Sequence, residues 1–335
     1  MSPRSPVLLL FLLLGLPLLV LSGGLYPPLE PFSTGHLNVS SLHQIYFEVS
    51  GNPNGTPVVC IHGGPGSSSS PMTRQFFDPA HYRIVLFDQR GCGKSLPPGE
   101  LRENDTWELV RDIEKLRVFL GLGRVLLFGG SWGTTLAMLY AQQYTTVVTG
   151  LILRGIYTHR VGEADWLFQE GASRIFPEPW QDYLAVIPAE ERSDLVEAYY
   201  RRLVSADYPT SLQAAREFVT WECKIAQLEP NQAACDLETD QRVYQRGAIE
   251  IHYFNFNMFF SEENQLLSQV WKIRHLPATI IHGRYDVVCP LENAWTLKSL
   301  WPEAEMHIAP RSGHSQWETE ITSLLVDATN KFRNL

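Results

Sequence analysis

Ser131 lies between two glycines in the segment GGSWG of residues 129–133, where an apolar run passes into helical spacing. Glycines at 129 and 133 permit a very tight turn between a strand and a helix, and such a turn exposes the serine hydroxyl at the end of a sheet. A serine hydroxyl is a poor nucleophile unless a base takes its proton and a carboxylate orients that base. Because an isolated G-x-S-x-G segment is also compatible with a glycine-rich connector, its function depends on residues elsewhere in the chain.

Two downstream segments can supply the carboxylate and the base. IIHGRYDVVCP, residues 280–290, places Asp286 in a loop after an apolar run, and MHIAPRSGHSQW, residues 306–317, places His314 after the next one. The order serine, aspartate, histidine is that of α/β-hydrolases. A surface loop is the alternative for His314 alone, but three residues in this order, each just after a strand-like run, favour acyl transfer by Ser131, Asp286 and His314.

Acyl transfer also requires hydrogen-bond donors for the oxyanion of the tetrahedral intermediate. HGGPG, residues 62–66, follows an early apolar run and matches the oxyanion-loop type of these enzymes. We assign the donors to the backbone N–H groups of Gly64 and of Trp132, the residue after the nucleophile. A plain tight turn is the alternative for this loop, and we expect His62 to be structural rather than a catalytic base.

Strand-like and helix-like segments alternate along the chain and must position these residues. Several of the strand-like runs are continuously apolar, as expected for strands covered on both faces. Residues 107–122 place Leu109, Ile113, Leu116 and Leu120 at helical spacing and end at Gly121. The strand-like runs are residues 44–49, 57–63, 83–89, 124–130, 150–155, 278–284 and 305–310. This βαβ series predicts the α/β class and an α/β-hydrolase fold with a mostly parallel central sheet.

The strand pattern stops between about residues 158 and 270, where residues 190–208 and 211–228 have helical patterns and several prolines interrupt the chain. An insertion that leaves a sheet and returns to it covers the carboxyl ends of the strands, where ligands bind in such folds. We therefore predict a hydrolase core of residues 25–157 and 271–335, with residues 158–270 inserted as a helical cap.

The first 24 residues differ from the rest of the chain. They contain Arg4, an apolar run over residues 7–21 and small residues at 22–24. This pattern predicts a signal peptide, because the run is shorter than the ~20 residues that a membrane-spanning helix needs. An uncleaved N-terminal membrane anchor is the alternative. We expect a secreted protein or one in the lumen of the secretory pathway, and the sequons at Asn38, Asn54 and Asn104 are compatible with glycosylation on that route.

The chain has five cysteines, which is too few for a disulfide scaffold. Cys60, Cys92 and Cys289 lie in apolar or tightly turning segments, so we expect them to be reduced. Cys223 and Cys235, twelve residues apart in a polar helical region, are the pair that could be oxidised.

Composition and spacing exclude several classes of function. The net charge of −9 argues against a nucleic-acid partner, because no basic surface is available to neutralise phosphates. RGCGKS, residues 90–95, resembles the end of a phosphate-binding loop, but Asp88 stands where that motif requires glycine. Histidines, cysteines and carboxylates do not cluster at metal-ligand spacing, so we expect neither a metal nor another cofactor.

Five segments together resemble the proline iminopeptidase family of α/β-hydrolases: HGGPG (62–66), DQRGCGKS (88–95), GGSWGTTLA (129–137), GRYDVVCP (283–290) and SGHS (312–315). The resemblance runs from about Leu25 to the C-terminus, and it departs from the family pattern in the apolar leader and in GKS where GRS is commoner. It implies a serine aminopeptidase that acts through an acyl-enzyme on peptides with a free N-terminal proline.

The resemblance also implies which cap residues hold the substrate. TWECK (220–224) and AIEIHYF (248–254) match the family's motifs for binding the free amino end, which gives Glu222 and Glu250. A protonated N-terminal amine in a partly dry pocket needs opposite charge nearby, and an internal peptide bond offers no such cation. Phe254 and Cys289 are expected to line the pocket for the pyrrolidine ring, with packing inside the cap as the alternative for Phe254.

Two other functions remain open on the same sequence. A general esterase or amidase would use the same triad with incidental cap carboxylates, and a secreted binding protein could keep the fold without activity. An enzyme with an aspartate nucleophile is disfavoured because serine occupies position 131. The sequence leaves open the oligomeric state and, beyond an uncleaved leader, gives no reason to expect a membrane partner.

Overall fold

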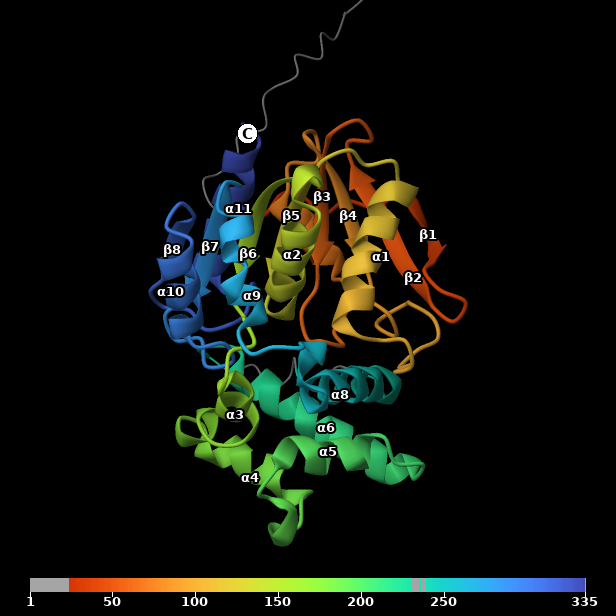
Figure 1. Cartoon of the computed structure of the whole chain (residues 1–335), viewed down its shortest axis with the longest axis vertical. Coiled ribbons are helices and arrows are strands. Elements are labelled where there is room, and N and C mark those ends of the chain that lie inside the picture. Colours follow the sequence, from red (N-terminus) through yellow and green to blue (C-terminus); the bar gives the residue numbers. More distant parts are fainter. Residues whose placement is uncertain (1–23, 230–234, 236–238, 335) are drawn as a thin grey trace, which may run out of the picture.

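The apolar runs form one eight-stranded sheet in the computed structural model, which describes residues 24–229, 235 and 239–334 (Figure 1). The strands are β1 (Ser33–Asn38), β2 (Gln44–Gly51), β3 (Thr56–Ile61), β4 (Tyr82–Phe87), β5 (Val125–Gly130), β6 (Val148–Arg154), β7 (Ala278–Gly283) and β8 (Glu305–Ala309). All seven strand-like runs of the sequence are strands. The sequence did not predict β1, because STGHLN has a single aliphatic side chain and lies largely exposed at the edge of the sheet.

The strand order is β1-β2-β4-β3-β5-β6-β7-β8. Strands β1 and β2 pair with their neighbours antiparallel, and every pairing from β4 to β8 is parallel. The prediction of a mostly parallel sheet is therefore confirmed. Because parallel strands end at one edge, the residues that follow β5, β7 and β8 come near one another there.

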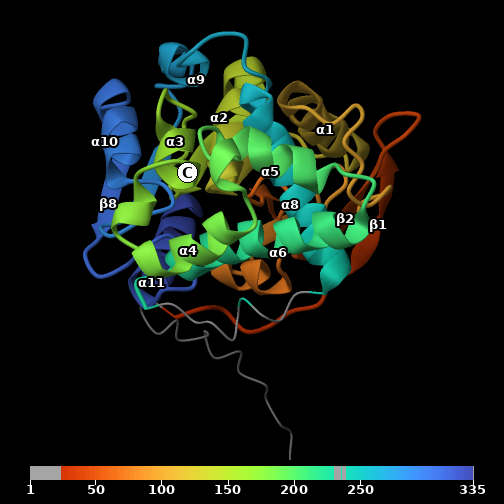
Figure 2. The ribbon, with the colours of Figure 1, turned by 90° about the horizontal axis from the view of Figure 1, so that it is seen from below.

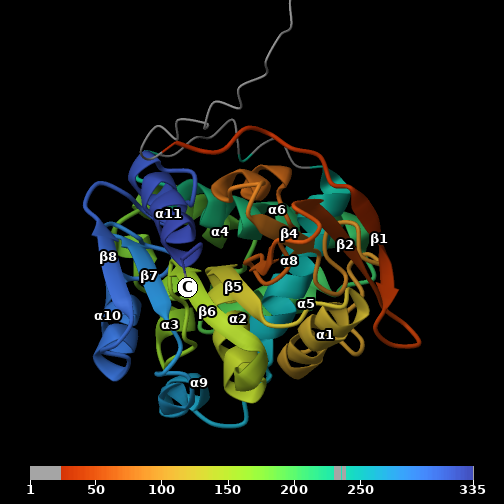
Figure 3. The ribbon, with the colours of Figure 1, turned by 90° about the horizontal axis from the view of Figure 1, so that it is seen from above.

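Helices cover both faces of the sheet (Figure 3). One face carries α1 (Thr106–Phe119), α2 (Trp132–Gln143) and α10 (Leu291–Leu300), and the other carries α11 (Thr319–Phe332) and the 3-10 helix η1 (Pro71–Phe76). Successive side chains of β5 point to opposite faces of the sheet. Leu127 belongs to the hydrophobic core that includes α2, and Phe128 belongs to the core that includes α11. Helix α1 lies where residues 107–122 predicted it, and Asp105 caps its start.

Helices fill the segment between β6 and β7, and none of its described residues belongs to a strand. Its α-helices are α3 (Glu163–Phe168), α4 (Pro177–Ala185), α5 (Leu195–Leu203), α6 (Tyr208–Ile225), α8 (Asp240–Asn255) and α9 (Gln265–Ser268). Among the described residues, the short 3-10 helices besides η1 are η2 (Thr145–Val147), η3 (Ala172–Arg174), η4 (Ala189–Glu191), η5 (Asn257–Phe259) and η6 (Val270–Lys272). Figures 1 and 2 show α4, α5, α6 and α8 gathered across one end of the sheet.

This helical segment contacts the core beside one of the predicted catalytic loops. The backbone N–H groups of His314 and Ser315 donate to the carbonyl of Ala226, just beyond α6, at 2.9 and 3.0 Å. The end of α6 is therefore attached to the loop that follows β8. We call residues 158–270 the cap below.

The five cysteines divide as the sequence suggested. Cys223 and Cys235 form a disulfide, with their Cα atoms 5.8 Å apart. Cys60, Cys92 and Cys289 are free and buried. The disulfide joins the last turns of α6 to a residue in the connection toward α8, so it tethers part of the cap next to Glu222.

The predicted leader, residues 1–24, lies outside the described residues except for Gly24. Among the residues that are described, no helix has the length and apolar character needed to cross a membrane. Two of the three sequons, Asn38 and Asn54, are exposed. Asn104 is buried, its amide donates to two backbone carbonyls, and its oxygen accepts from the Tyr253 hydroxyl, so the folded chain leaves no room for a glycan there.

Candidate active site

Ser131 occupies a sharp turn between β5 and α2, with φ 57° and ψ −129°. Serine is rarely found at such a φ, and the surrounding contacts hold it there. The turn is closely packed, because a Cβ built on Gly129 would lie 2.4 Å from the carbonyl oxygen of Gly133, and one on Gly133 would lie 2.2 Å from that of Ile61. The glycines of the GGSWG segment are therefore required by close backbone approach.

We expect Gly133→Ala to destabilise the protein by about 1–3 kcal/mol, because the added methyl group must push back the carbonyl of β3. Gly123→Ala is the matched control, since a Cβ there would meet nothing within 4 Å. Chemical denaturation of both variants measures the difference. Equal unfolding free energies for the two variants would contradict the role given to the turn.

The structure brings Asp286 and His314 together at the edge where β7 and β8 end. His314 Nδ1 lies 2.8 Å from Asp286 Oδ2, and the other carboxylate oxygen accepts from the backbone N–H of Cys289 at 2.8 Å. A second histidine, His282 on β7, lies 3.3 Å from Asp286 Oδ2. All three side chains are buried.

These contacts set the charge of Asp286. Burial alone would raise the pKa of its carboxyl, but the charge and hydrogen bond of His314, with smaller contributions from His282 and the Cys289 N–H, hold the pKa below its usual value. Burial lowers the pKa of His282, whose Nδ1 accepts from the N–H of Ile156 and whose Nε2 therefore donates to the carbonyl of Cys289. Asp286 thus stays a carboxylate that can hold the His314 proton on Nδ1.

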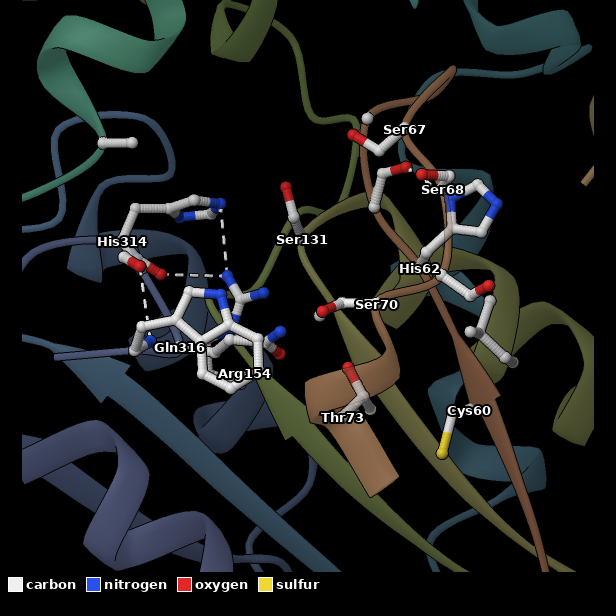
Figure 4. A pocket seen from close by; sticks show the side chains of 18 of the residues that line it. Cys60, His62, Ser67, Ser68, Ser70, Thr73, Ser131, Arg154, His314 and Gln316 are labelled. Carbon is white, nitrogen blue, oxygen red and sulfur yellow. Dashed lines mark hydrogen bonds between the residues drawn. The ribbon is translucent and has the colours of Figure 1, made fainter. Parts of the chain in front are cut away.

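Arg154, at the end of β6, was not predicted from the sequence and lies beside His314 (Figure 4). Its Nη1 donates to the His314 carbonyl at 3.0 Å and lies 3.2 Å from His314 Nε2, the atom that would take the serine proton. The Ser131 hydroxyl forms no hydrogen bond with any residue that the structure describes. A charged residue at the end of the apolar run GLILRG was the signal that could have drawn attention to Arg154.

The predicted oxyanion donors lie beside Ser131. Trp132 is the first residue of α2, and the N–H groups of a helix's first turn have no acceptor within the helix. Gly64 lies in the loop after β3 with φ +107°, a conformation that favours glycine. His62 holds this loop to the DQRG segment, because its Nε2 accepts from the Gln89 N–H at 3.0 Å and burial lowers its pKa. The expectation that His62 is structural is consistent with these contacts.

A cavity of about 390 Å³ opens beside Ser131. Its walls include Ser131, His314, Arg154 and the loop of Gly63 and Gly64. Cap residues also line it, among them Glu222 and Arg246. The predicted nucleophile, the predicted base and one of the predicted cap carboxylates therefore line the same space.

The two predicted cap carboxylates share an arginine that the sequence reasoning missed. Arg246 donates from Nη2 to Glu222 Oε2, and its Nε lies 3.6 Å from Glu250 Oε2. Glu250 is 1% exposed, and neither of its carboxylate oxygens accepts a hydrogen bond from the described part of the chain. Burial, followed by the charge of Glu222, raises the pKa of Glu250 well above its usual value, and Arg246 opposes that shift. The i, i+4 spacing of Arg246 and Glu250 on one helix was the available signal.

Phe254 and Cys289 do not line this cavity. Phe254 packs edge-to-face against Phe168 and against Tyr157, with ring centroids 4.6 and 6.1 Å apart. Cys289 is 2% exposed and donates its backbone N–H to Asp286. Their assignment to a pocket for the pyrrolidine ring stays a prediction, and the structure places both in packed surroundings.

The sequence of this chain is similar to those of known proteins. Residues 56–320 match a protein-family model described as the alpha/beta hydrolase fold. A probable proline iminopeptidase of Leptolyngbya boryana is 50% identical over 309 residues, which cover 92% of this chain and 96% of that protein. A proline iminopeptidase of Arabidopsis thaliana is 49% identical over 313 residues, which cover 93% of this chain and 82% of that one.

Solved structures agree on the fold at much lower identity. An esterase from Exiguobacterium antarcticum superimposes with a TM-score of 0.62 and 22% identity, over 90% of this chain and all of that one. A proline iminopeptidase from Mycobacterium smegmatis gives a TM-score of 0.53 and 18% identity, over 90% of this chain and 99% of that one. These two matches establish the α/β-hydrolase fold and do not distinguish between activities.

Proposed function

The chain belongs to the proline iminopeptidase family of α/β-hydrolases, and we propose on that premise that it is a serine aminopeptidase releasing proline from the N-terminus of peptides. The observation that carries the proposal is the buried pair of cap carboxylates, Glu222 and Glu250, with Glu222 in the wall of the cavity that also contains Ser131 and His314. Burying two carboxylates costs free energy, and a hydrolase that acted on neutral esters alone would gain no substrate binding in return.

In the proposed first half-reaction, Ser131 attacks the carbonyl carbon of the N-terminal residue while His314 Nε2 takes the hydroxyl proton. Arg154 must give up its contact with that nitrogen for this to happen. Asp286 keeps the other proton on Nδ1 and stabilises the imidazolium that forms. The backbone N–H groups of Gly64 and Trp132 stabilise the oxyanion, and His314 then protonates the leaving amine as the C–N bond breaks.

The second half-reaction repeats these steps with water. His314 takes a proton from a water molecule, which attacks the acyl-enzyme, and the proton is returned to Ser131 as proline leaves. The same donors stabilise the second tetrahedral intermediate.

Glu222 and Glu250 select the substrate in this proposal. The secondary amine of an N-terminal proline carries a positive charge and two N–H donors, which a pair of carboxylates can accept. An internal peptide bond carries neither, so the carboxylates restrict the enzyme to chain ends. They also orient the scissile carbonyl toward Ser131, which lowers the barrier by positioning.

The test compares a proline arylamide with its N-acetylated form. We expect the wild type to hydrolyse the free amine far faster, and Glu222→Gln to lower kcat/KM for it by about 10- to 100-fold, mainly through KM, because a charge-assisted hydrogen bond is lost. Turnover of the acetylated form should not change. Glu217→Gln on the same helix is the matched control, because Glu217 does not line the cavity.

Two results would redirect the proposal. Equal turnover of the free and acetylated arylamides would remove amine recognition and favour a general esterase or amidase. A folded protein that no fluorophosphonate labels would favour a binding protein without activity.

We further propose that the enzyme works in the lumen of the secretory pathway or outside the cell. The leader pattern of residues 1–24, the exposed sequons at Asn38 and Asn54, and the disulfide between Cys223 and Cys235 all support this, because disulfides persist in oxidising compartments. Protein secreted from animal cells should begin near residue 24 and lose mass on deglycosylation. Denatured protein should show three thiols before reduction and five after it. Retention of the leader on membranes would instead favour the anchor.

A further inference from the structure

The cavity extends beyond the reacting groups, between two facing walls. Figure 4 shows Ser131 between a wall that includes His314, Arg154 and Gln316 and a wall that includes Ser67 and Thr73. The cavity also reaches the sheet, where β3, β4 and β5 contribute to it. Of the residues predicted to hold the first residue of the substrate, Glu222 lines the cavity, and Phe254 and Cys289 do not. The part of the cavity that reaches the sheet therefore lies beyond the predicted amine ligand.

Proton transfer determines which part of a peptide enters this space. His314 must lie within hydrogen-bond reach of the leaving nitrogen when it protonates that atom. His314 lines the cavity, and so do the next two residues of the chain, Ser315 and Gln316. The residue whose nitrogen is released therefore begins in this cavity.

The floor of the cavity is apolar. Cys60 on β3 is in register with Leu86 on β4 and with Phe128 on β5, so these three side chains lie next to one another on one face of the sheet. None is more than 5% exposed. Burial raises the pKa of the Cys60 thiol well above its usual value, so this side chain is a small neutral group. Such a floor favours an apolar side chain over a polar one.

The walls above the floor are polar and have free hydrogen-bonding capacity. Within the described residues, the hydroxyls of Ser67 and Thr73 and the side-chain amide of Gln316 have no hydrogen-bond partner. The three serines between them have partners, because Ser68 accepts from Arg242, Ser69 donates to Asp88 and Ser70 accepts from the N–H of Met72. Polar groups left free in a cavity wall can pair with the main chain of a peptide.

From these observations we propose that the part of the cavity that reaches the sheet is the leaving-group pocket of the enzyme. It binds the residue that follows the released proline, with an apolar side chain on the floor of Cys60, Leu86 and Phe128 and the main chain between Ser67, Thr73 and Gln316. The proposal rests on the proposed function in one respect, which is that Ser131 is the nucleophile. It makes the second residue of the peptide, as well as the first, a determinant of specificity.

The experiment measures kcat/KM for four dipeptide amides, in which proline is followed by glycine, alanine, leucine or phenylalanine. We expect the wild type to prefer leucine and phenylalanine over glycine by roughly 10- to 100-fold. Cys60→Leu, which fills the floor, should lower the value for Pro-Phe amide by about tenfold and leave Pro-Gly amide within about twofold. Cys60→Ala, which enlarges the floor and retains a small side chain, should keep or increase the preference for phenylalanine.

Cys92→Ala is the matched control, because Cys92 is equally a buried free cysteine and does not line the cavity. It should keep the wild-type order of substrates. A wild-type enzyme that treats all four amides alike would overturn the proposal. So would a Cys60→Leu variant that loses activity on Pro-Gly and Pro-Phe amides to the same extent.

A parallel series separates this proposal from the proposed aminopeptidase activity. Acetate esters of ethanol and of 2-phenylethanol present a small and a large leaving group to Ser131 without a proline. If no amide releases proline while the wild type prefers the larger ester and Cys60→Leu abolishes that preference, the leaving-group pocket stands and the aminopeptidase assignment fails. If the esters too are hydrolysed without preference, the pocket is wrong.

Discussion

Ser131→Ala should lower kcat for a proline arylamide by about 10⁶-fold, the loss expected when the nucleophile of a serine triad is removed. The methyl group of alanine fits the space of the serine side chain, and the Ser131 hydroxyl makes no hydrogen bond within the described residues, so the fold should be unaffected. Covalent labelling by a fluorophosphonate should disappear along with the activity. The thermal midpoint should stay at the wild-type value.

Ser312→Ala is the control for that variant. Ser312 is fully buried two residues before His314, its hydroxyl has no hydrogen-bond partner among the described residues, and it does not line the cavity. Activity and labelling should survive in this variant. If Ser131→Ala kept more than about a hundredth of the wild-type kcat, a different nucleophile would have to be sought, because a triad without its serine retains far less.

Asp286→Asn should lower kcat by about 10⁴-fold with little change in stability. The reason lies in the two hydrogen bonds of this carboxylate. The amide oxygen of asparagine can still accept from the Cys289 N–H, which turns the amide nitrogen toward His314 Nδ1. An N–H facing Nδ1 favours the tautomer with its proton on Nε2, and that nitrogen can then no longer take the proton of Ser131.

The steady-state rate at neutral pH and the melting temperature together test this prediction. Asp182→Asn is the control, since Asp182 lies on the exposed surface of the cap and pairs with Lys224. A loss of kcat that matched a loss of folded protein would show that Asp286 serves only the fold. A loss of kcat in stable protein assigns it to the reaction.

Much of the fold could be predicted because it depends on patterns that are local in the sequence. Buried parallel strands are continuous apolar runs, and each of the seven runs became a strand. The order of Ser131, Asp286 and His314 followed from the same pattern, because each follows a strand that ends at one edge. Strand β1 escaped prediction since an exposed edge strand requires no apolar pattern.

The parts that could not be predicted depend on contacts between distant segments. Arg154 reaches His314 across 160 residues of sequence, and Arg246 reaches Glu222 by way of the packing of α6 against α8. Neither pairing has a local signature. The surroundings of Phe254 could not be predicted either, because the aromatic run 251–260 does not indicate which ring packs against Phe168 and which ring faces a ligand.

The arginine between the cap carboxylates has a consequence for the net charge that a substrate must bring. Because burial and the charge of Glu222 raise the pKa of Glu250, the empty site favours a protonated Glu250, and Arg246 then balances Glu222. A cation bound beside Glu250 favours its ionised form, and the two negative charges and the guanidinium of Arg246 then sum to a single negative charge. One protonated proline nitrogen makes the sum zero, so the occupied site leaves no unbalanced ion out of contact with water. A ligand with a second positive charge at the same place would leave a surplus of one, and a neutral ligand would gain no ion pair with Glu250. The charge count therefore favours monocationic chain ends.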